Sequence, residues 1–219
     1  MTTTPSTIFT QIRNQANEQS SAFWSDEEIY RIMSEAENQV AGALKCTQDS
    51  TSFSTADGTR EYSLGADVGQ ISRLTWDSYR LRAIDLNNLD VVEGSAYGGA
   101  DQSGNPQYYY LWGSSIGLSP VPDSAKTCTI YHNAIPTELE STSTGFTIPS
   151  QYSYCVTSYT LWQMFVKDQQ LQEEAAFYSK KYMVDLETAR SDWMARNDDR
   201  YQQVTVVDPI WDTGVYGVF

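Results

Sequence analysis

Histidine is almost absent from this sequence of 219 residues, which contains only His132. One imidazole cannot build a histidine-rich metal site, and no second histidine is left to activate a nucleophile elsewhere in the chain. His132 lies near the end of a predicted strand and before a turn. A hydrogen-bonded structural role is the ordinary one for such a position, so we expect no catalysis from it.

Basic residues are also scarce, since 14 Lys and Arg stand against 28 Asp and Glu, giving a formal net charge of −14. An acidic surface does not hold phosphate groups, so we expect no direct binding of nucleic acid. The charge is compatible with a protein past which DNA slides, because a repelling wall holds nothing. It is equally compatible with acidity that serves solubility alone.

Long apolar runs and a cysteine framework are missing as well. The N-terminus is not of the basic and apolar signal type, and no apolar run would span a bilayer. We therefore expect synthesis in a cytosol-like compartment and no membrane contact. The three cysteines, Cys46, Cys128 and Cys155, are odd in number and share no metal-ligand spacing. We expect each to be reduced and mostly buried.

Motifs of catalysis occur only as fragments. The tripeptide Asp212-Thr213-Gly214 matches the short motif of aspartic proteases, but it stands a few residues from the end of the sequence without a second copy, and a turn is the simpler interpretation. The glycines between Gly94 and Gly104 lack a dinucleotide or phosphate-loop pattern. We therefore predict a protein that is not an enzyme, with no catalytic residue, no cofactor and no metal.

What the sequence does contain is a strong helical pattern from residue 149 to residue 200. Apolar residues recur there at spacings of three and four, which places each set on one face of a helix. Only Asp168, Gln169 and Gln170 separate the two periods, so the helices should run antiparallel and pack against each other. The two sets are Tyr152, Cys155, Val156, Tyr159, Trp162, Gln163 and Val166, then Leu171, Ala175, Tyr178, Tyr182, Leu186, Ala189 and Trp193.

The first of these helices is apolar nearly all round. Its other side carries Tyr154, Leu161 and Phe165. A helix of this kind needs more than one neighbour to cover it, either elsewhere in the chain or in another copy. We assign these three residues to subunit packing.

The N-terminus predicts two further helices that could cover this hairpin. Pro5 suits a first helical position with Thr4 as its cap. Ser25 caps a second helix, and Glu28 completes the capping box three residues later. Apolar spacing extends this second helix to about Lys45.

Between residues 50 and 149 the pattern changes to short β-rich runs separated by Gly, Pro, Asn and Asp. Asp57-Gly58 predicts a hairpin between Thr51–Phe53 and Arg60–Leu64. Further turns are predicted between Trp76 and Tyr79, and at Gly113-Ser114. The fold class is therefore α+β, with a helical bundle built from N- and C-terminal helices and an inserted antiparallel β module.

The predicted parts are a helical bundle (1–49 and 150–200), a β-rich domain (50–149) and an extended C-terminal docking tail (201–219). The tail is too apolar for a solvated segment and too short for a core of its own, so it should dock onto something.

This layout resembles the head–tail adaptor proteins of tailed bacteriophages, including the tubular adaptors of short-tailed phages. The likeness covers residues 23 to 200, and its specificity lies in the order of several turn and packing patterns. One departure is Gly65 after Leu64, where the family usually has proline. The patterns are Trp24-Ser25-Asp26-Glu27-Glu28-Ile29, Gly58-Thr59-Arg60-Glu61-Tyr62-Ser63-Leu64, Gly104-Asn105-Pro106-Gln107-Tyr108-Tyr109, Ile116-Gly117-Leu118-Ser119-Pro120-Val121-Pro122, Ile130-Tyr131, and Asp168 followed by Tyr178 and Tyr182.

The resemblance implies a structural protein of the virion, made in the host bacterial cytoplasm. Such adaptors form a homo-oligomeric ring, typically of twelve copies, below the portal protein. The ring extends the DNA channel, lets DNA pass without specific binding, and attaches a tail (nozzle or tubular) protein. A terminal segment commonly docks to the portal, which here would involve Val206, Pro209, Ile210, Trp211, Tyr216, Val218 and Phe219.

An alternative function is a carbohydrate- or surface-binding module of a phage tail or secreted protein. Tyr108, Tyr109, Tyr110 and Trp112, with the glycine-rich stretch beside them, could form a sugar platform. Alternate residues of a strand face opposite ways, however, so sheet packing on both faces also accounts for these aromatic residues.

Overall fold

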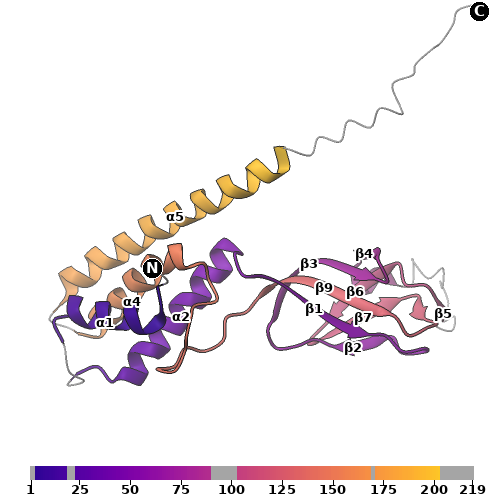
Figure 1. Cartoon of the computed structure of the whole chain (residues 1–219), viewed down its shortest axis with the longest axis horizontal. Helices are drawn as coiled ribbons and strands as arrows, with labels where there is room; N and C mark the ends of the chain where they lie inside the picture. The colour runs from indigo at the N-terminus through magenta and orange to yellow at the C-terminus, as the bar shows by residue number, and fades with distance from the viewer. Residues whose placement is uncertain (1–2, 19–22, 90–102, 169–170, 203–219) are drawn as a thin grey trace, which may run out of the picture.

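The chain forms an elongated molecule with a helical bundle at one end and a β module at the other (Figure 1). In this computed structural model the described residues are 3–18, 23–89, 103–168 and 171–202, with the backbone alone described for 197–202. The order of elements confirms the predicted α+β class, because helices from both ends of the sequence flank the β module. The division into domains, with 201–219 as a tail, stays a prediction, and residues 203–219 lie outside the described part.

Four α-helices of the described residues form the bundle, and local sequence signals set where the first two of them begin. Pro5 stands in the first turn of α1, and the Thr4 hydroxyl accepts from the Thr7 N–H at 3.3 Å. The Ser25 hydroxyl accepts from the Glu28 N–H at 3.2 Å, which caps α2 as predicted. The helices are α1 (Pro5–Gln15), α2 (Asp26–Leu44), α4 (Ser153–Lys167) and α5 (Gln172–Gln202).

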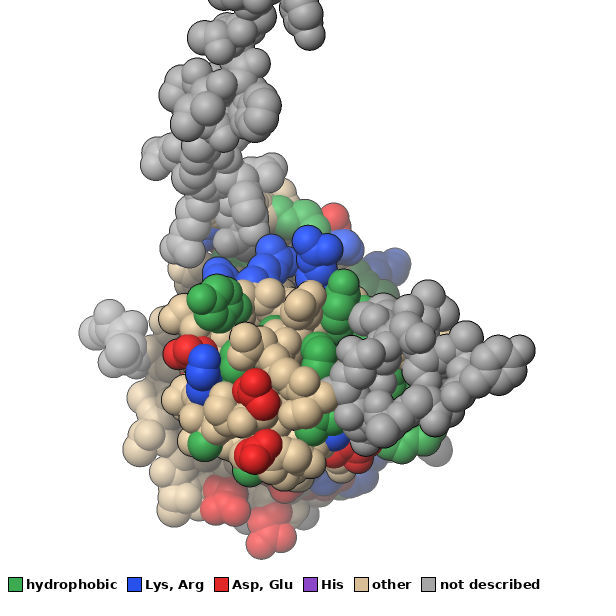
Figure 2. Space-filling model, turned by 90° about the vertical axis from the view of Figure 1, so that its right-hand side faces the viewer, with side chains coloured by type: hydrophobic (Ala, Val, Ile, Leu, Met, Phe, Trp, Pro, Cys, Tyr) green, Lys and Arg blue, Asp and Glu red, His purple; other side chains and the backbone are tan. Residues whose placement is uncertain are grey.

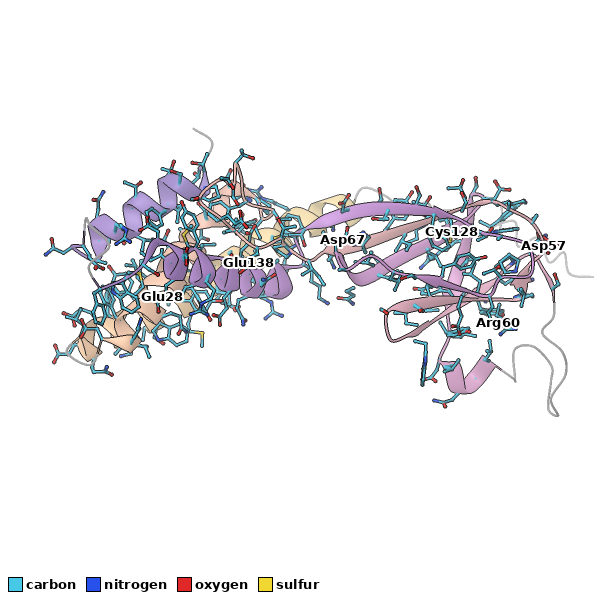
Figure 3. The ribbon with its side chains drawn as sticks, turned by 90° about the horizontal axis from the view of Figure 1, so that it is seen from below. Glu28, Asp57, Arg60, Asp67, Cys128 and Glu138 are labelled. Carbon is cyan, nitrogen blue, oxygen red and sulfur yellow. The ribbon has the colours of Figure 1, made fainter. Side chains whose placement is uncertain are left out.

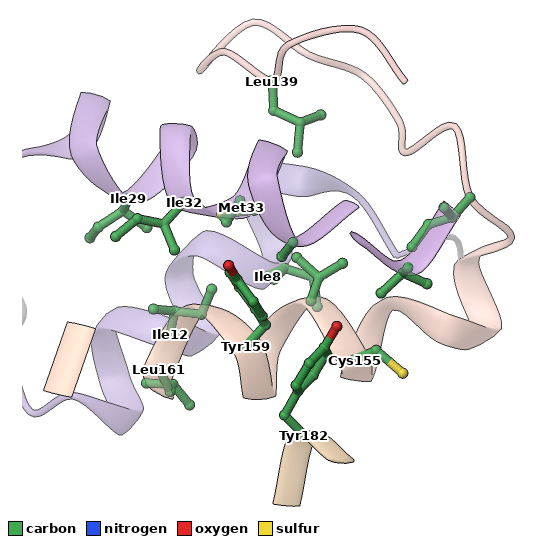
Figure 4. Close-up of a cluster of buried hydrophobic side chains, with 14 of the residues drawn as sticks. Ile8, Ile12, Ile29, Ile32, Met33, Leu139, Cys155, Tyr159, Leu161 and Tyr182 are labelled. Atoms are coloured by element: carbon green, nitrogen blue, oxygen red, sulfur yellow. The ribbon is translucent and has the colours of Figure 1, made fainter. Parts of the chain in front are cut away.

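The helices α4 and α5 pack against each other in the bundle core, as the apolar spacing predicts. The rings of Tyr159 and Tyr182, one from each helix, lie 5.1 Å apart. Figure 4 shows α1 and α2 contributing side chains such as Ile8 and Met33 to the same cluster. The N-terminal helices therefore cover the hairpin from within the chain.

The segment between the last strand and α4 binds along α2 through two buried polar side chains. The Ser34 hydroxyl accepts a hydrogen bond from the Leu139 N–H at 2.7 Å. Glu37 accepts from the N–H groups of Thr147 and, at 3.1 Å, Ile148. These bonds satisfy main-chain groups that packing against α2 removes from water.

The β module is one seven-stranded sheet with the order β1-β9-β3-β4-β6-β7-β2. Within the described residues, the module also contains a two-stranded pair, β5 with β8, and a short 3₁₀ helix at Leu86–Asn88. A second 3₁₀ helix, at Ser150–Tyr152, leads into α4. The strands are β1 (Gln48–Ser54), β2 (Glu61–Ser63), β3 (Val68–Trp76), β4 (Tyr79–Ala83), β5 (Ser103–Gly104), β6 (Tyr108–Trp112), β7 (Ser115–Ser119), β8 (Val121–Pro122) and β9 (Thr127–Ala134).

The predicted hairpin across Asp57-Gly58 is wrong. Gly58 does turn the chain with a φ of +73°, but β1 pairs with β9 and β2 pairs with β7. The two strands occupy opposite ends of the strand order. Their side chains still meet, because the sheet curls and brings the Phe53 and Tyr62 rings to 4.9 Å. The turn therefore carries the chain across the open side of the curled sheet.

The sheet is mixed, which corrects the prediction of an antiparallel module. Most neighbours are antiparallel, including the predicted β3–β4 and β6–β7 hairpins. β4 and β6 run parallel, as do β5 and β8. Parallel neighbours need a long connection rather than a tight turn, and residues 84–107 provide one between β4 and β6.

Two chain segments join the β module to the bundle, and they lie side by side (Figures 1 and 3). The Thr47 hydroxyl donates to the Ala134 carbonyl at 2.6 Å, and the Ala134 N–H donates to the Thr47 carbonyl at 2.6 Å. Lys45 ends α2 in a left-handed conformation, with φ of +52°. The chain thus leaves and re-enters the bundle at one place.

Candidate interaction surfaces

The outer face of α5 carries the largest group of exposed apolar side chains on the bundle. Phe177, Met183, Val184 and Met194 are 52–65% exposed. Phe177 and Val184 are seven residues apart, and Met183 and Met194 are eleven apart, so each pair returns to one side of the helix. The opposite side of α5 is buried in the core through Ala175, Tyr182 and Ala189 among others. The exposed apolar side chains on the otherwise polar outer side of α5 make this face a candidate contact surface.

The residues assigned to subunit packing lie mostly inside the chain. Leu161 is fully buried and Phe165 nearly so, both within the bundle core. The Phe165 ring lies 5.4 Å from that of Tyr178 on α5. Tyr154 is half-buried and donates its hydroxyl to the Asp185 carbonyl at 3.5 Å. The chain's own helices thus cover the second apolar side of α4, and the exposed apolar surface lies on α5 instead.

The residues assigned to portal docking lie outside the described residues. They are Val206, Pro209, Ile210, Trp211, Tyr216, Val218 and Phe219. The Asp212-Thr213-Gly214 tripeptide and the glycine-rich stretch from 94 to 102 lie outside them as well.

The aromatic strand β6 does not present its rings as one platform. Tyr109 and Tyr110 are buried, whereas Trp112 is 64% exposed. Tyr109 belongs to the module core, and the Tyr110 hydroxyl donates to Glu61 at 3.2 Å. The Tyr110 ring lies over Gly117, where an added Cβ would stand only 2.0 Å from it. Packing on both faces therefore accounts for these tyrosines.

The histidine and the cysteines, which are the candidates for chemistry, have structural roles. His132 is buried, and its Nε2 shares a hydrogen bond of 3.2 Å with the Thr51 hydroxyl. The three cysteines are buried free thiols, as predicted. Burial raises the pKa of Cys46 to about 11 and that of Cys128 to about 12, so neither thiol ionises at neutral pH. Within the described residues, no three His, Cys, Asp or Glu side chains gather as metal ligands would.

One cluster that the sequence patterns did not indicate joins α4 to α5. The Ser158 hydroxyl donates to Asp185 at 2.5 Å, and the Lys181 ammonium lies 2.6 Å from the same carboxylate and 3.0 Å from the Ser158 oxygen. A serine beside a lysine can act as a nucleophile, but Ser158 is 1% exposed and its proton points to a carboxylate. The cluster serves to hold the helical hairpin together.

The apolar spacing in the sequence predicts the buried face of α5, but it does not predict the group of exposed apolar side chains on the opposite face. The signal was present, because Phe177, Met183, Val184 and Met194 interrupt an otherwise polar side. Single exposed apolar residues are common on protein surfaces, so their meaning depends on seeing that they share one face. Separately, no helix of the described residues combines the length and apolar character that crossing a bilayer requires.

One family model, described as SU10 adaptor protein, matches the chain over residues 3–207. The match therefore spans the bundle and the β module together. A comparison with curated proteins gives no match. Because the family model covers nearly the whole sequence, the chain belongs to the SU10 adaptor protein family, a family of structural adaptor proteins of bacteriophages.

Proposed function

We propose that this protein joins the head of a phage particle to its tail, as a ring of subunits below the portal. The ring extends the DNA channel and presents a surface to a tail (nozzle or tubular) protein. The family match over residues 3–207 is the observation that carries this proposal. Twelve copies is the number that the likeness to head–tail adaptors implies.

Contacts between subunits would use the outer face of α5, defined by Phe177, Met183, Val184 and Met194. Burial of apolar surface contributes about 25 cal/mol per Å², so four large side chains on one face give a substantial driving force. A ring gives each subunit two neighbours, so an extended apolar face can be covered without leaving an open end. Leu161 and Phe165 support the same contact from beneath, since they hold α4 in the core on which α5 lies.

The net charge of −14 suits a channel wall. Repeated around a ring, it would produce a negative potential that repels the DNA backbone. DNA could then move through the lumen without being held at specific positions.

The C-terminal segment would attach the ring to the portal protein. Its apolar residues would dock in many equivalent copies, so a modest affinity for each copy becomes strong attachment of the whole ring. The proposed docking residues are Val206, Pro209, Ile210, Trp211, Tyr216, Val218 and Phe219.

Electron microscopy of portal rings mixed with the purified protein tests this function. Wild-type protein should add a ring of density below the portal. Removal of residues 204–219 should leave a folded protein, judged by its circular dichroism, that no longer attaches. Attachment by the shortened protein would contradict the docking assignment, and failure of the wild-type protein to attach would contradict the adaptor function itself.

Substitution of the α5 outer face separates attachment from ring formation. Phe177→Ser with Val184→Ser should allow individual copies to bind the portal but should prevent a closed ring. Thr188→Val, at an exposed position of the same helix, is a matched control that leaves these side chains intact. Closed rings formed by the double variant would move the subunit contact to another face.

A further inference from the structure

Three arginines gather on the outer face of the β module. Leu74 pairs with Leu81 across β3 and β4, with both side chains in the core, which places Arg73 beside Arg82 on the outside. Thr75 pairs with Arg80 on the same outer face. Arg73, Arg80 and Arg82 are all exposed. An acidic chain thus carries a compact basic patch, which we term the arginine face.

No intrachain carboxylate compensates this patch within the described residues, where the ion pairs of the β module involve other side chains. Arg73 instead lies over the ring of Tyr131, at 5.9 Å from its centroid. Like charges on neighbouring strands destabilise a sheet, so three uncompensated guanidinium groups cost the isolated fold free energy. A bound anion would remove that cost.

The surface around these arginines is hollowed on both sides of β4. A hollow of about 710 Å³ is lined by all three, and one of about 500 Å³ by Arg80 and Arg82 with the exposed Tyr79. Lys126, in the second hollow, is already paired with Asp77 at 2.9 Å. Arginine and tyrosine are the residue types enriched where proteins bind proteins.

Figure 2 shows the end of the β module, with Lys and Arg side chains gathered along its upper side, where β3 and β4 lie in Figure 1. Asp and Glu side chains lie lower on the same view, together with a few Lys and Arg side chains. The basic side chains at this end of the module are therefore densest along β3 and β4. Two copies placed side by side in the same orientation would bring the arginines of one towards the carboxylates that lie lower on the other.

We propose that the arginine face binds a carboxylate-bearing surface of a neighbouring copy of this chain. A second copy fits because each carries 28 Asp and Glu residues against 14 Lys and Arg. The rival ligand is the phosphate of DNA, which the net charge of −14 disfavours at long range. The choice of a second copy rests on the proposed function as a ring, whereas the uncompensated patch is independent of it.

The test compares ring formation on portal protein by wild type and by the double variant Arg80→Gln/Arg82→Gln. The variant should need about a tenfold higher concentration for half-maximal ring formation, because charge pairs at an interface are lost. Wild-type assembly should weaken with added salt, and the variant should respond less. Its melting temperature should be unchanged or slightly higher, since the arginines repel one another in the free chain.

A charge-matched control is Gln11→Glu/Gln15→Glu on the exposed side of α1, which lowers the net charge by the same amount. Rings that form equally well from wild type and the arginine variant would overturn the proposal. So would loss of assembly in the control to the same degree, because net charge would then be the cause. Binding of a short DNA duplex that disappears in the arginine variant, with ring formation intact, would assign the face to phosphate instead.

Failure of the wild-type protein to form rings would contradict the proposed function without deciding this contact. Sedimentation of the free chain at high concentration and low salt then decides it. Association that the arginine variant lacks supports the copy-to-copy contact, and a wild-type chain that stays monomeric under those conditions overturns it.

Discussion

The bundle and the β module are organised in opposite ways. The bundle core combines α1 and α2 with α4 and α5, so its parts come from both ends of the sequence. The core of the β module is built from one continuous stretch, between Phe53 and Ile130. β1 pairs with β9 from Gln48 to Ser54, which places entry and exit of the module side by side. The chain therefore leaves the bundle and re-enters it at the same place. The bundle core can form because this brings α4 and α5 back beside α1 and α2.

Their surfaces differ as well. The bundle exposes a large apolar group on α5, whereas the outer face of β3 and β4 is polar and carries the arginine face. Burial of an apolar helix face gives a strong but non-directional contact. A charged sheet face gives specificity for the partner and fixes the register of the contact. In the proposed ring, the two regions would offer different kinds of contact to a neighbouring copy.

Large-to-small substitutions in the two cores should produce the largest effects and keep them separate. Trp76→Ala in the β module should lower its free energy of unfolding by about 3–5 kcal/mol, and Leu161→Ala should lower that of the bundle by about 2–5 kcal/mol. Both side chains are almost fully buried. Hydrogen exchange should quicken mainly in the region that carries the change. Equal quickening across both regions would mean that they unfold as one unit.

Two glycines should respond in opposite directions. Gly117→Ala in β7 forces a Cβ against the Tyr110 ring and should destabilise the β module by about 1–3 kcal/mol. Gly42→Ala in α2 meets nothing within 4 Å and should stabilise the bundle by about 0.4–1 kcal/mol. Urea unfolding of each variant measures the change, and a neutral Gly117→Ala would show that Tyr110 can move aside at no cost.

Glu37 should make the stability of the bundle depend on pH. Its carboxylate is buried on α2, and burial raises its pKa above the ordinary value of 4.5, although hydrogen bonds from Ile148 and Thr147 oppose this. The folded state therefore holds the proton more tightly than the unfolded state. This contribution to stability is complete below pH 4.5 and is lost as the pH rises through the raised pKa.

The measurement compares wild type with Glu37→Gln, which keeps an acceptor for the two N–H groups but does not titrate. The difference in unfolding free energy should shift against the wild type as pH rises from 4.5, since only the wild type then buries a charge. Parallel curves for the two proteins would contradict the raised pKa. Hydrogen exchange in the β module should not follow this titration, because Glu37 accepts its hydrogen bonds from the segment between β9 and α4, on the bundle side of the molecule.

The smallest effect on stability is expected on the outer face of α5. Phe177→Ser with Val184→Ser should change the free energy of unfolding by no more than about 0.5 kcal/mol per substitution, because both side chains are exposed. Tyr182→Ser on the buried side of the same helix is the contrasting variant and should destabilise the bundle clearly. Thermal unfolding distinguishes the two faces, and a large loss from the outer pair would mean that it packs within the chain.

Local features of this fold could be predicted from the sequence because local interactions determine them. Thr4 and Ser25 cap helices through hydrogen bonds to residues three positions away. The apolar spacing on both sides of Asp168 predicts the α4–α5 hairpin, and Gly113 supplies the φ of +58° that the β6–β7 turn uses. Each of these depends on only a few neighbouring residues.

Strand pairing could not be predicted in the same way. Asp57-Gly58 indicates a turn, but a turn does not determine which strands pair with the two strands beside it. β1 finds β9 about eighty residues later, and its Phe53 meets Tyr62 across the curled sheet rather than along a ladder. The parallel β4–β6 pair likewise depends on a long connection whose path no short pattern encodes.

The candidate surfaces differ in the same way, because one can be predicted from the sequence and another needs the fold. The tail residues from Val206 to Phe219 are recognisable from composition alone, whereas the arginine face needs β3 beside β4 in one register before Arg73 joins Arg80 and Arg82. Periodicity places Tyr154, Leu161 and Phe165 on an apolar side of α4, but it does not show what covers that side.

The sequence by itself determined where helices begin, which faces are apolar, the acidic charge and the order of parts that characterises the family. Tertiary structure alone decided that α1 and α2 cover the second side of α4, that the sheet is mixed and curled, and that α5 keeps an apolar face outside. The physical reason is the sequence separation over which each kind of interaction acts. Capping and periodicity act over one or two helical turns, whereas burial is settled only when distant segments compete for the same surface.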